Sequence, residues 1–206
     1  MPYDLDKWAN RLASRSDISG YIFHMTKANN EKGLNAFEVL IKILKERTLL
    51  GSTTEKGFIT GDRKAVCFQD TPISSVVENI YHEQLFREVL GGKIRYTHYG
   101  ICFPKSYIFQ QGGRPVFYEQ KEIAKQILAK EEYWRIVDYN LSDKNNIIDW
   151  THEREWRLPT DKFEFDLSKV VVLLPNSDSY RNLINHLPKE DLETIRGVIQ
   201  TSPLVH

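Results

Sequence analysis

The chain has 206 residues, enough for one generous domain with a substantial buried core. Lysine plus arginine (28) equal aspartate plus glutamate (28), which excludes a strong overall field that would attract a polyanion. The sequence lacks an apolar run of about 18 residues, and residues 1–6 are acidic where a signal peptide would be basic and then apolar. We therefore expect a cytoplasmic protein without a membrane partner.

The first half of the chain alternates helical periodicity with short apolar strands. In chain order we expect a helix at 3–14, a strand at 21–26, a helix at 36–47, a mobile loop at 52–63, a strand at 64–68 and a helix at 73–89. The strand at 21–26 carries a single imidazole, His24. Thr71 and Pro72 are predicted to begin the helix at 73–89, as its N-cap and its first helical residue.

The second half of the chain is richer in aromatic residues and turns. We expect strands at 96–103, 107–109, 116–118 and 169–174, and helices at 119–132, 178–186 and 189–196. In the strand expected at 169–174, every residue from Val170 to Leu174 is valine or leucine, which is typical of a central strand covered on both faces. Because internal repeats and clear linkers are absent from the sequence, a single α+β domain spanning 1–206 is favoured.

The two cysteines and the local basic residues narrow the chemistry further. Cys67 and Cys102 each lie in an apolar run and are predicted to be buried free thiols, with neither a disulfide framework nor zinc-ligand spacing. The local concentration of basic residues that we single out comprises Lys93, Arg95, His98, Lys105 and Arg114. A solvated surface of mixed charge is the favoured interpretation of this set, with a nucleic-acid patch as the alternative.

The stretch from Asp149 to Pro159 places several titratable side chains around two indoles. Turn formers precede it and a proline ends it, so it is predicted to be one strand. On a strand, one face would carry every second residue, namely Thr151, Glu153, Glu155 and Arg157, and the other His152, Arg154, Trp156 and Leu158. Two neighbouring carboxylates indicate a wet cleft or cationic partners, and a solvated ion-pair ladder is the alternative. We expect Trp156 and Leu158 to face the core, so that Trp156→Ala would destabilise the fold by about 3–5 kcal/mol.

Three motifs follow one another in a fixed order. Phe23-His24-Met25-Thr26 joins an aromatic residue, a histidine and a small hydroxyl residue on the first strand. Residues 64–75 run from a strand into a serine-bearing helix, and residues 152–159 carry the glutamates. This order resembles the ADP-ribosyltransferase superfamily over roughly residues 20–175. It is most similar to the DNA-modifying ADP-ribosyltransferase toxins of bacterial toxin–antitoxin pairs and to abortive-infection phage-resistance proteins.

The resemblance implies a fold and a reaction. The fold would be α+β, with two packed mixed or antiparallel sheets flanked by helices around a cleft for NAD, the substrate. Glu155 matches the family's catalytic glutamate and would stabilise the oxocarbenium-like ribose as nicotinamide leaves. Glu153 would orient or deprotonate the acceptor, and His24 would hold a ribose hydroxyl. No metal ion is implied.

Further residues would complete the NAD site. The resemblance assigns binding of NAD to His24, Met25, Thr26, Cys67, Phe68, Ser74, Tyr81, Arg63 and Arg114. Cys67 stands where well-known family members have a tyrosine, so stacking against nicotinamide would come from Phe68 or Tyr81. Arg63 or Arg114 would neutralise the pyrophosphate, and loop 52–63 would close as a lid.

The acceptor and the biological role are less sharply defined. A nucleic acid, DNA or RNA, is the favoured acceptor, and a protein side chain is the alternative. The toxin likeness implies a toxin–antitoxin or phage-defence role, with a possible antitoxin protein as partner. Two other hypotheses remain open. One is a metal-dependent nuclease using His24, Asp70, Glu153 and Glu155, and the other is a catalytically inactive binding or immunity protein with the same fold.

Overall fold

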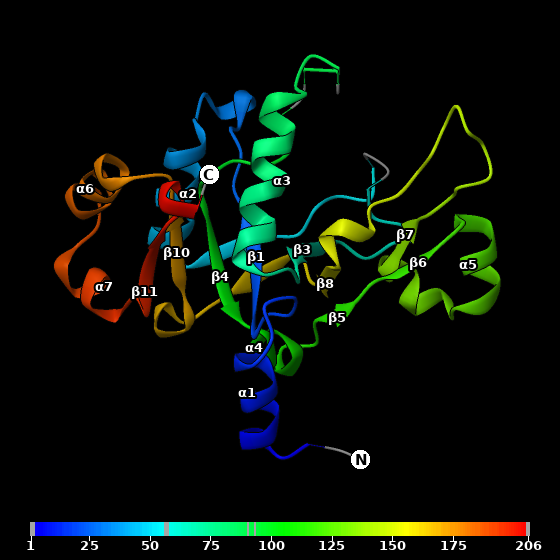
Figure 1. Cartoon of the computed structure of the whole chain (residues 1–206), viewed down its shortest axis with the longest axis horizontal. Helices are drawn as coiled ribbons and strands as arrows, with labels where there is room; N and C mark the ends of the chain where they lie inside the picture. Colours follow the sequence, from blue (N-terminus) through cyan, green and yellow to red (C-terminus); the bar gives the residue numbers. More distant parts are fainter. Residues whose placement is uncertain (1–2, 56–57, 90, 93, 205–206) are drawn as a thin grey trace. The chain divides into compact units, whose positions relative to one another are not determined.

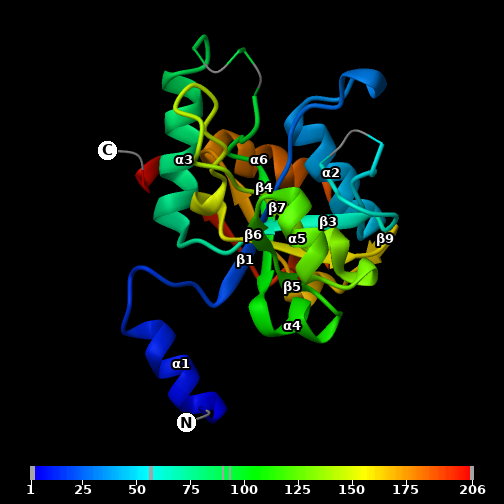
Figure 2. The same cartoon turned by 90° about the vertical axis from the view of Figure 1, so that its right-hand side faces the viewer.

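The computed structural model describes residues 3–55, 58–89, 91–92 and 94–204. The chain forms two compact units. Unit 1 comprises Met1–Thr48, Thr71–Pro104 and Phe165–His206, and unit 2 comprises Leu49–Asp70 and Lys105–Glu164. Strands and helices occur in both units, as Figures 1 and 2 show, so the predicted α+β class is confirmed. Among the described residues, every helix is too short or too polar to cross a bilayer.

Unit 1 contains four neighbouring strands of a mixed sheet. Its strands, in sheet order, are β11 (Gly197–Gln200), β10 (Val171–Leu174), β4 (Gly100–Pro104) and β1 (Tyr21–Met25). β10 pairs with β11 in parallel, and β4 pairs antiparallel with both β10 and β1. The helices of this unit are α1 (Leu5–Ala13), α2 (Ala36–Glu46), α3 (Ile73–Leu85), α6 (Ser177–His186) and α7 (Lys189–Thr194), with short 3₁₀ helices η1 (Asn30–Lys32), η4 (Leu167–Lys169) and η5 (Ser202–Leu204).

Part of the core of unit 1 lies between these strands and helix α3. One cluster of buried residues joins strands β1, β4 and β10 to α3, and comprises Phe23, Val76, Ile80, Tyr96, Cys102 and Leu173. The prediction of a central strand at 169–174 is confirmed, since β10 lies between two strands and Val172, Leu173 and Leu174 are buried. Helix α2 begins with a capping box between Asn35 and Glu38, which satisfies backbone donors at its N-terminus.

Unit 2 contains three neighbouring strands that pair antiparallel in the order β3 (Ala65–Gln69), β8 (Glu155–Pro159) and β5 (Arg114–Pro115). Unit 2 has two further strand pairs. β6 (Phe117–Glu119) pairs with β7 (Ile136–Asp138), and β9 (Lys162–Glu164) pairs with β2 (Thr48–Leu50). The last two residues of β2 belong to unit 2. Its helices are α4 (Lys105–Gln110), α5 (Lys121–Ile127), η2 (Lys130–Arg135) and η3 (Thr151–Glu153). Ile59, Ala65 and Trp134 form its small buried cluster, against which Cys67 packs.

Several predicted elements differ from the structure. Residues 107–109 form part of helix α4 and not a strand, and β4 covers only 100–104 of the strand predicted at 96–103. The helix predicted at 119–132 splits into α5 and η2, and the helix at 73–89 ends at Leu85. Pro72, and not Thr71, is the N-cap of α3, and it makes no side-chain cap bond. The short strands β2, β9 and β11 were not predicted, because three or four residues carry too little periodicity.

Candidate functional site

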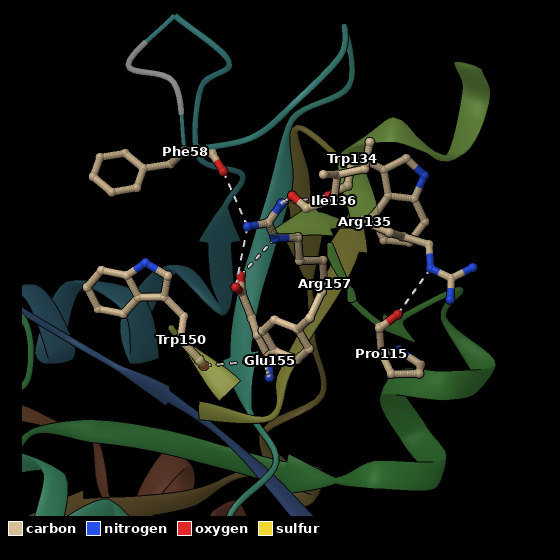
Figure 3. A network of polar contacts seen from close by, with 9 residues as sticks. Phe58, Pro115, Trp134, Arg135, Ile136, Trp150, Glu155 and Arg157 are labelled. Atoms are coloured by element: carbon tan, nitrogen blue, oxygen red, sulfur yellow. Dashed lines mark hydrogen bonds and ion pairs between the residues drawn. The ribbon is translucent and has the colours of Figure 1, made fainter. Parts of the chain in front are cut away.

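A buried ion pair marks the centre of the candidate site, and all its contacts lie within unit 2. Glu155 and Arg157, two residues apart on β8, are 7% and 4% exposed. The Arg157 Nε atom donates to Glu155 Oε1 at 2.8 Å, and Nη2 donates to Oε2 at 3.3 Å. Figure 3 shows the carboxylate facing the guanidinium. The arrangement is bidentate, which fixes the orientation of the carboxylate as well as its charge.

The guanidinium of Arg157 also joins three backbone segments. Nη1 donates to the carbonyls of Trp134 at 2.8 Å and Ile136 at 3.0 Å, and Nη2 donates to the carbonyl of Phe58 at 3.2 Å. With the two bonds to Glu155, these contacts use the five N–H groups that an arginine carries. Burial lowers the pKa of Arg157, but Glu155 and Cys67 together outweigh this effect, so the pKa of Arg157 is raised.

Tyr118 and Cys67 surround the same carboxylate. The backbone N–H of Glu155 donates to the Tyr118 hydroxyl at 2.7 Å, and that hydroxyl donates to the carbonyl of Trp150 at 3.4 Å. Cys67 lies on β3 in register with Arg157. Burial, reinforced by the negative charge of Glu155, raises the pKa of the Cys67 thiol well above its ordinary value. The thiol is therefore held neutral, as expected for an unreactive cysteine.

The predicted single strand from 150 to 158 is wrong at its beginning. Residues 151–153 form the 3₁₀ helix η3, Arg154 adopts a left-handed conformation with φ 45°, and the strand begins at Glu155. Glu153 and Glu155 therefore do not share a strand face. The negative charge of Glu153 nevertheless contributes to raising the pKa values of Cys67 and Tyr118. The two glutamates thus act on the same two groups, Cys67 and Tyr118, from different elements.

The expected core-facing side of the strand is also corrected. Leu158 is buried as predicted, but Trp156 is only half-buried, whereas Glu155 and Arg157 on the opposite face are buried. The indole N–H of Trp156 donates to Asp70 Oδ2 at 3.1 Å, and Lys105 forms an ion pair with Asp70 Oδ1 at 2.6 Å. Burial raises the pKa of Asp70, although both of these partners oppose the shift. Neither strand face is the solvated ladder that was the alternative.

The other predicted site residues divide between the two units. His24, Met25, Thr26, Ser74 and Tyr81 belong to unit 1, on β1, directly after it, or on α3. The Thr26 hydroxyl donates to the carbonyl of Ala36 at 3.0 Å, which is a structural contact. Tyr81 is 48% exposed and Ser74 is exposed, so both are accessible to solvent. The NAD-binding roles of these five residues stay predictions.

In unit 2, the structure constrains three residues assigned to NAD. Phe68 is 1% exposed in the core, which leaves it without an accessible ring face for stacking. Arg114 lies over the ring of Phe109, 4.0 Å from its centroid, and donates to the carbonyls of Phe109 and Gly113. Arg63 is exposed, with its guanidinium 5.9 Å from the centroid of Trp134. Arg63 is therefore the more accessible of the two candidates for the pyrophosphate.

The basic residues singled out in the sequence are engaged by partners. Arg95 pairs with Glu83, Lys105 with Asp70, and His98 lies 2.9 Å from the hydroxyl of Thr201. Lys93 lies outside the described residues. Residues 56–57 of loop 52–63 also lie outside the described residues. In the rest of the loop, Ile59 and Thr60 are buried, and the carbonyl of Phe58 accepts a hydrogen bond from Arg157. Closure of the loop as a lid would therefore leave residues 58–60 in place.

Neither the grouping of possible metal ligands nor comparison with known proteins assigns a function to the site. Across the described ranges, no three His, Cys, Asp or Glu residues are grouped so that they could hold a metal ion, which gives the nuclease hypothesis no support. Comparisons with protein-family models, with curated proteins and with solved structures found no match to the chain. The resemblance to ADP-ribosyltransferases therefore rests on the motifs in the sequence.

Sequence reasoning missed the roles of Arg157 and Tyr118. A glutamate and an arginine two residues apart on a strand necessarily share one face, so their pairing could have been inferred from the Glu155-Trp156-Arg157 spacing. The part played by Tyr118 has no such signal. Its hydroxyl reaches the backbone of Glu155 from a strand 37 residues earlier, a contact that only the folded chain creates.

Proposed function

We propose that this protein is an ADP-ribosyltransferase that cleaves the nicotinamide–ribose bond of NAD and transfers ADP-ribose to a macromolecular acceptor. The observation that carries the proposal is the carboxylate of Glu155. It lies where the motif order predicts the family's glutamate, and Arg157 holds it in a fixed orientation by two hydrogen bonds. Preorganised groups of this kind stabilise developing charge without reorganising during the reaction.

The chemistry that the carboxylate would perform is defined by the bond that breaks. The bond from the nicotinamide nitrogen to ribose C1′ breaks with both electrons leaving on nicotinamide, and positive charge develops on the ribose. A carboxylate has about four lone-pair sites, of which Arg157 uses two on Glu155, and a ribose hydroxyl would donate to one of the others. An acceptor nucleophile then bonds to C1′ and loses its proton, for which Glu153 is the proposed base.

A second function is favoured by a different observation. Arg157 uses its full set of donors on Glu155 and on three carbonyls, as a purely structural arginine would. A buried pair of this kind also offsets much of the negative charge that the proposed reaction needs. The alternative is therefore a catalytically inactive binding or immunity protein, in which the pair only holds unit 2 together.

Release of nicotinamide from NAD decides between the two functions. We expect the purified wild type to release nicotinamide and to transfer label from NAD to nucleic acid. Glu155→Gln should reduce release by at least about 100-fold, the scale at which single electrostatic groups contribute. Glu164→Gln is the matched control, because Glu164 is an exposed glutamate on β9 of the same unit. If no nicotinamide is released and no label is transferred to any acceptor, the proposed ADP-ribosyltransferase function is wrong.

A double variant separates chemistry from folding. Glu155→Gln alone leaves Arg157 buried without its counter-charge, so lost activity could reflect lost structure. Glu155→Gln with Arg157→Met removes both charges. A double variant that folds but releases no nicotinamide supports the chemical role, whereas one that folds and keeps full activity assigns the pair to structure alone. Circular dichroism at the assay temperature monitors folding in each case.

A further inference from the structure

Helix α1 presents an apolar stripe that its own unit leaves largely uncovered. Leu5, Trp8, Ala9 and Leu12 recur at spacings of three and four, so their side chains share one face of the helix. The structure describes all nine residues of α1, and none of them is buried. Leu5 is 73% exposed. In Figures 1 and 2 the helix projects beyond the end of β1, away from α2, α3 and α6 of the same unit.

The C-terminal end of α1 meets the segment that leads into β1. A Cβ atom at Gly20 would come within 3.1 Å of Leu12 Cδ1, so Leu12 lies against this segment. Along the stripe, Leu5 and Ala9 are exposed, and Trp8 and Leu12 are half-buried. An isolated helix of this length is marginal in water, and the burial of its apolar face supplies most of its stability. We therefore expect a partner for the stripe from outside the unit.

The order of the residues makes the stripe complementary to itself. A two-fold axis between residues 8 and 9 would place a second copy of α1 antiparallel to the first, with the same patch of both copies in the interface. Leu5 of each copy would then lie opposite Leu12 of the other, and Trp8 opposite Ala9. Each large indole would cover a small methyl group, and a pair of leucines would close each end.

The charges beside the stripe fit the same arrangement. Asp4, the N-cap of α1, and Arg11 are seven residues apart, so they lie on one flank of the stripe. In an antiparallel pair this flank meets the same flank of the other copy, and Asp4 lies about 3 Å along the axis from Arg11 of the second copy. Within one chain, Asp4 pairs with Lys7, and Arg11 lies over the ring of Tyr3. Both contacts are exposed and contribute little.

A parallel pair would lack both kinds of complementarity. It would set the two Trp8 indoles against each other and leave Ala9 opposite Ala9. It would also bring together the acidic N-terminal ends, where Asp4 and Asp6 of each copy lie, and align the two helix dipoles side by side.

We propose that α1 is a dimerisation helix, which pairs antiparallel with α1 of a second copy of this chain. The proposal is independent of the proposed enzymatic function. A helix of nine residues is about 14 Å long, so the helix pair alone covers less than the roughly 800 Å² per partner of a standard stable interface. We therefore expect a reversible dimer with a dissociation constant of about 1–100 μM.

Sedimentation velocity of the complete protein over a concentration series tests the dimer. The wild type should pass from monomer to dimer as its concentration rises. Leu5→Gln should weaken association by at least about 10-fold, because each dimer loses two buried leucine side chains. Leu85→Gln is the matched control, since Leu85 is a 61% exposed leucine on α3 of the same unit, and it should associate as the wild type does. Circular dichroism monitors the folding of each variant.

Cross-linking tests the orientation of the two helices. Leu5→Cys and Leu12→Cys, one of them labelled with ¹⁵N, are mixed and treated with a short bis-maleimide. Antiparallel pairing predicts a mixed dimer that mass spectrometry identifies, and little product from either variant alone. The untreated cysteines provide the background. Burial raises the pKa of Cys67 and of Cys102, so the wild type should react little.

Four outcomes would overturn the proposal. The first is a wild type that stays monomeric up to about 500 μM, well above the expected dissociation constant. The second is equal weakening by Leu5→Gln and Leu85→Gln, and the third is preferential cross-linking of Leu5→Cys with itself, which indicates a parallel pair. The fourth is binding of the monomer to anionic phospholipid vesicles that Leu5→Gln abolishes, which would assign the stripe to a membrane surface.

Discussion

Arg157 is the residue on which the polar contacts of unit 2 converge. It is 4% exposed, and its five hydrogen bonds reach β8, η2, β7 and the loop that contains Phe58. Isolated buried charges are costly, so a guanidinium is stable in this position only because each of its donors has an acceptor. Removal of the arginine would leave a carboxylate and three carbonyls without those bonds.

The first prediction concerns the coupling between the two charges. Arg157→Met should destabilise the protein by about 3–5 kcal/mol, the usual cost of leaving one member of a buried pair alone. The double variant with Glu155→Gln should lose less than the sum of the single losses by about 0.5–3 kcal/mol, because contacting residues are not additive. Urea unfolding of the four proteins measures this coupling.

A surface pair provides the control for that cycle. Lys162 and Glu164 are also two residues apart on a strand of unit 2, but both are exposed. The Lys162→Met and Glu164→Gln cycle should give a coupling of about 0–1 kcal/mol. Equal coupling energies for the buried and exposed pairs would contradict the structural role that we assign to Arg157.

The second prediction concerns alkaline pH and Cys102. Burial in the core of unit 1 raises the pKa of this thiol from 9.0 to about 12. The unfolded chain loses the proton near pH 9 while the folded protein keeps it, so the stabilising contribution is complete below pH 9 and is lost as the pH rises towards 12. Over that window, this group should lower the free energy of unfolding by about 1.4 kcal/mol per pH unit.

Urea unfolding at several alkaline pH values, under reducing conditions, measures that slope. Cys102→Ala should be less stable than the wild type at neutral pH, because it leaves a small cavity. Its stability should nevertheless decline less steeply between pH 9 and pH 11. Parallel declines in the two proteins would show that Cys102 titrates normally in the folded state.

At the scale of elements, the beginning of strand β8 is fixed by neighbouring segments and not by its own sequence. The left-handed residue Arg154 ends η3, and the next residue begins the strand. The hydroxyl of Tyr118, on β6, accepts a hydrogen bond from the N–H of Glu155 and donates one to the carbonyl of Trp150. One hydroxyl thereby connects the strand that carries the glutamate to the segment that carries the half-buried indole of Trp150.

The third prediction tests this connection. Tyr118→Phe should destabilise the protein by about 1–3 kcal/mol, because the backbone N–H of the buried Glu155 loses its acceptor. It should also reduce nicotinamide release, since the carboxylate is no longer held at its strand end. Tyr139→Phe is the control, because Tyr139 is a half-buried tyrosine of the same unit. Equal stability of Tyr118→Phe and the wild type would mean that water replaces the hydroxyl.

At the scale of the whole molecule, the chain passes between its two units four times. The predicted residues His24 and Glu155 therefore belong to different units, and each unit has its own cluster of buried hydrophobic residues. The single ADP-ribosyltransferase-like domain that we expect over residues 1–206 stays a prediction. Neither unit is a continuous stretch of sequence, so each is best tested within the complete chain.

The fourth prediction concerns the complete protein in cells. If the proposed reaction occurs, expression of the wild type should slow growth, as modification of a macromolecule would. Glu155→Gln, expressed to the same level, should relieve that effect, while Glu164→Gln should not. The resemblance further predicts relief by His24→Ala. Growth curves with matched immunoblots measure the outcome, and equal toxicity of the wild type and Glu155→Gln would argue against catalysis as its cause.

The sequence by itself determined the elements with strong periodicity or continuous apolar character. The helix at 36–47, the strand at 21–26 and the central strand at 169–174 correspond to α2, β1 and β10, because each buries a face that its own residues define. The α+β class followed from their alternation. The motif order also singled out Glu155, whose catalytic role stays a prediction.

Tertiary structure alone decided how the titratable side chains are used. Alternation along 151–157 predicted a shared face for Glu153 and Glu155, but the strand begins only at Glu155, where Tyr118 supplies an acceptor from another strand. The sequence also could not show that Arg157 would bury its charge, since the carbonyls that make this possible belong to Phe58, Trp134 and Ile136. Local pattern fixes which residues share a face, whereas the partners that make a buried charge stable come from distant parts of the chain.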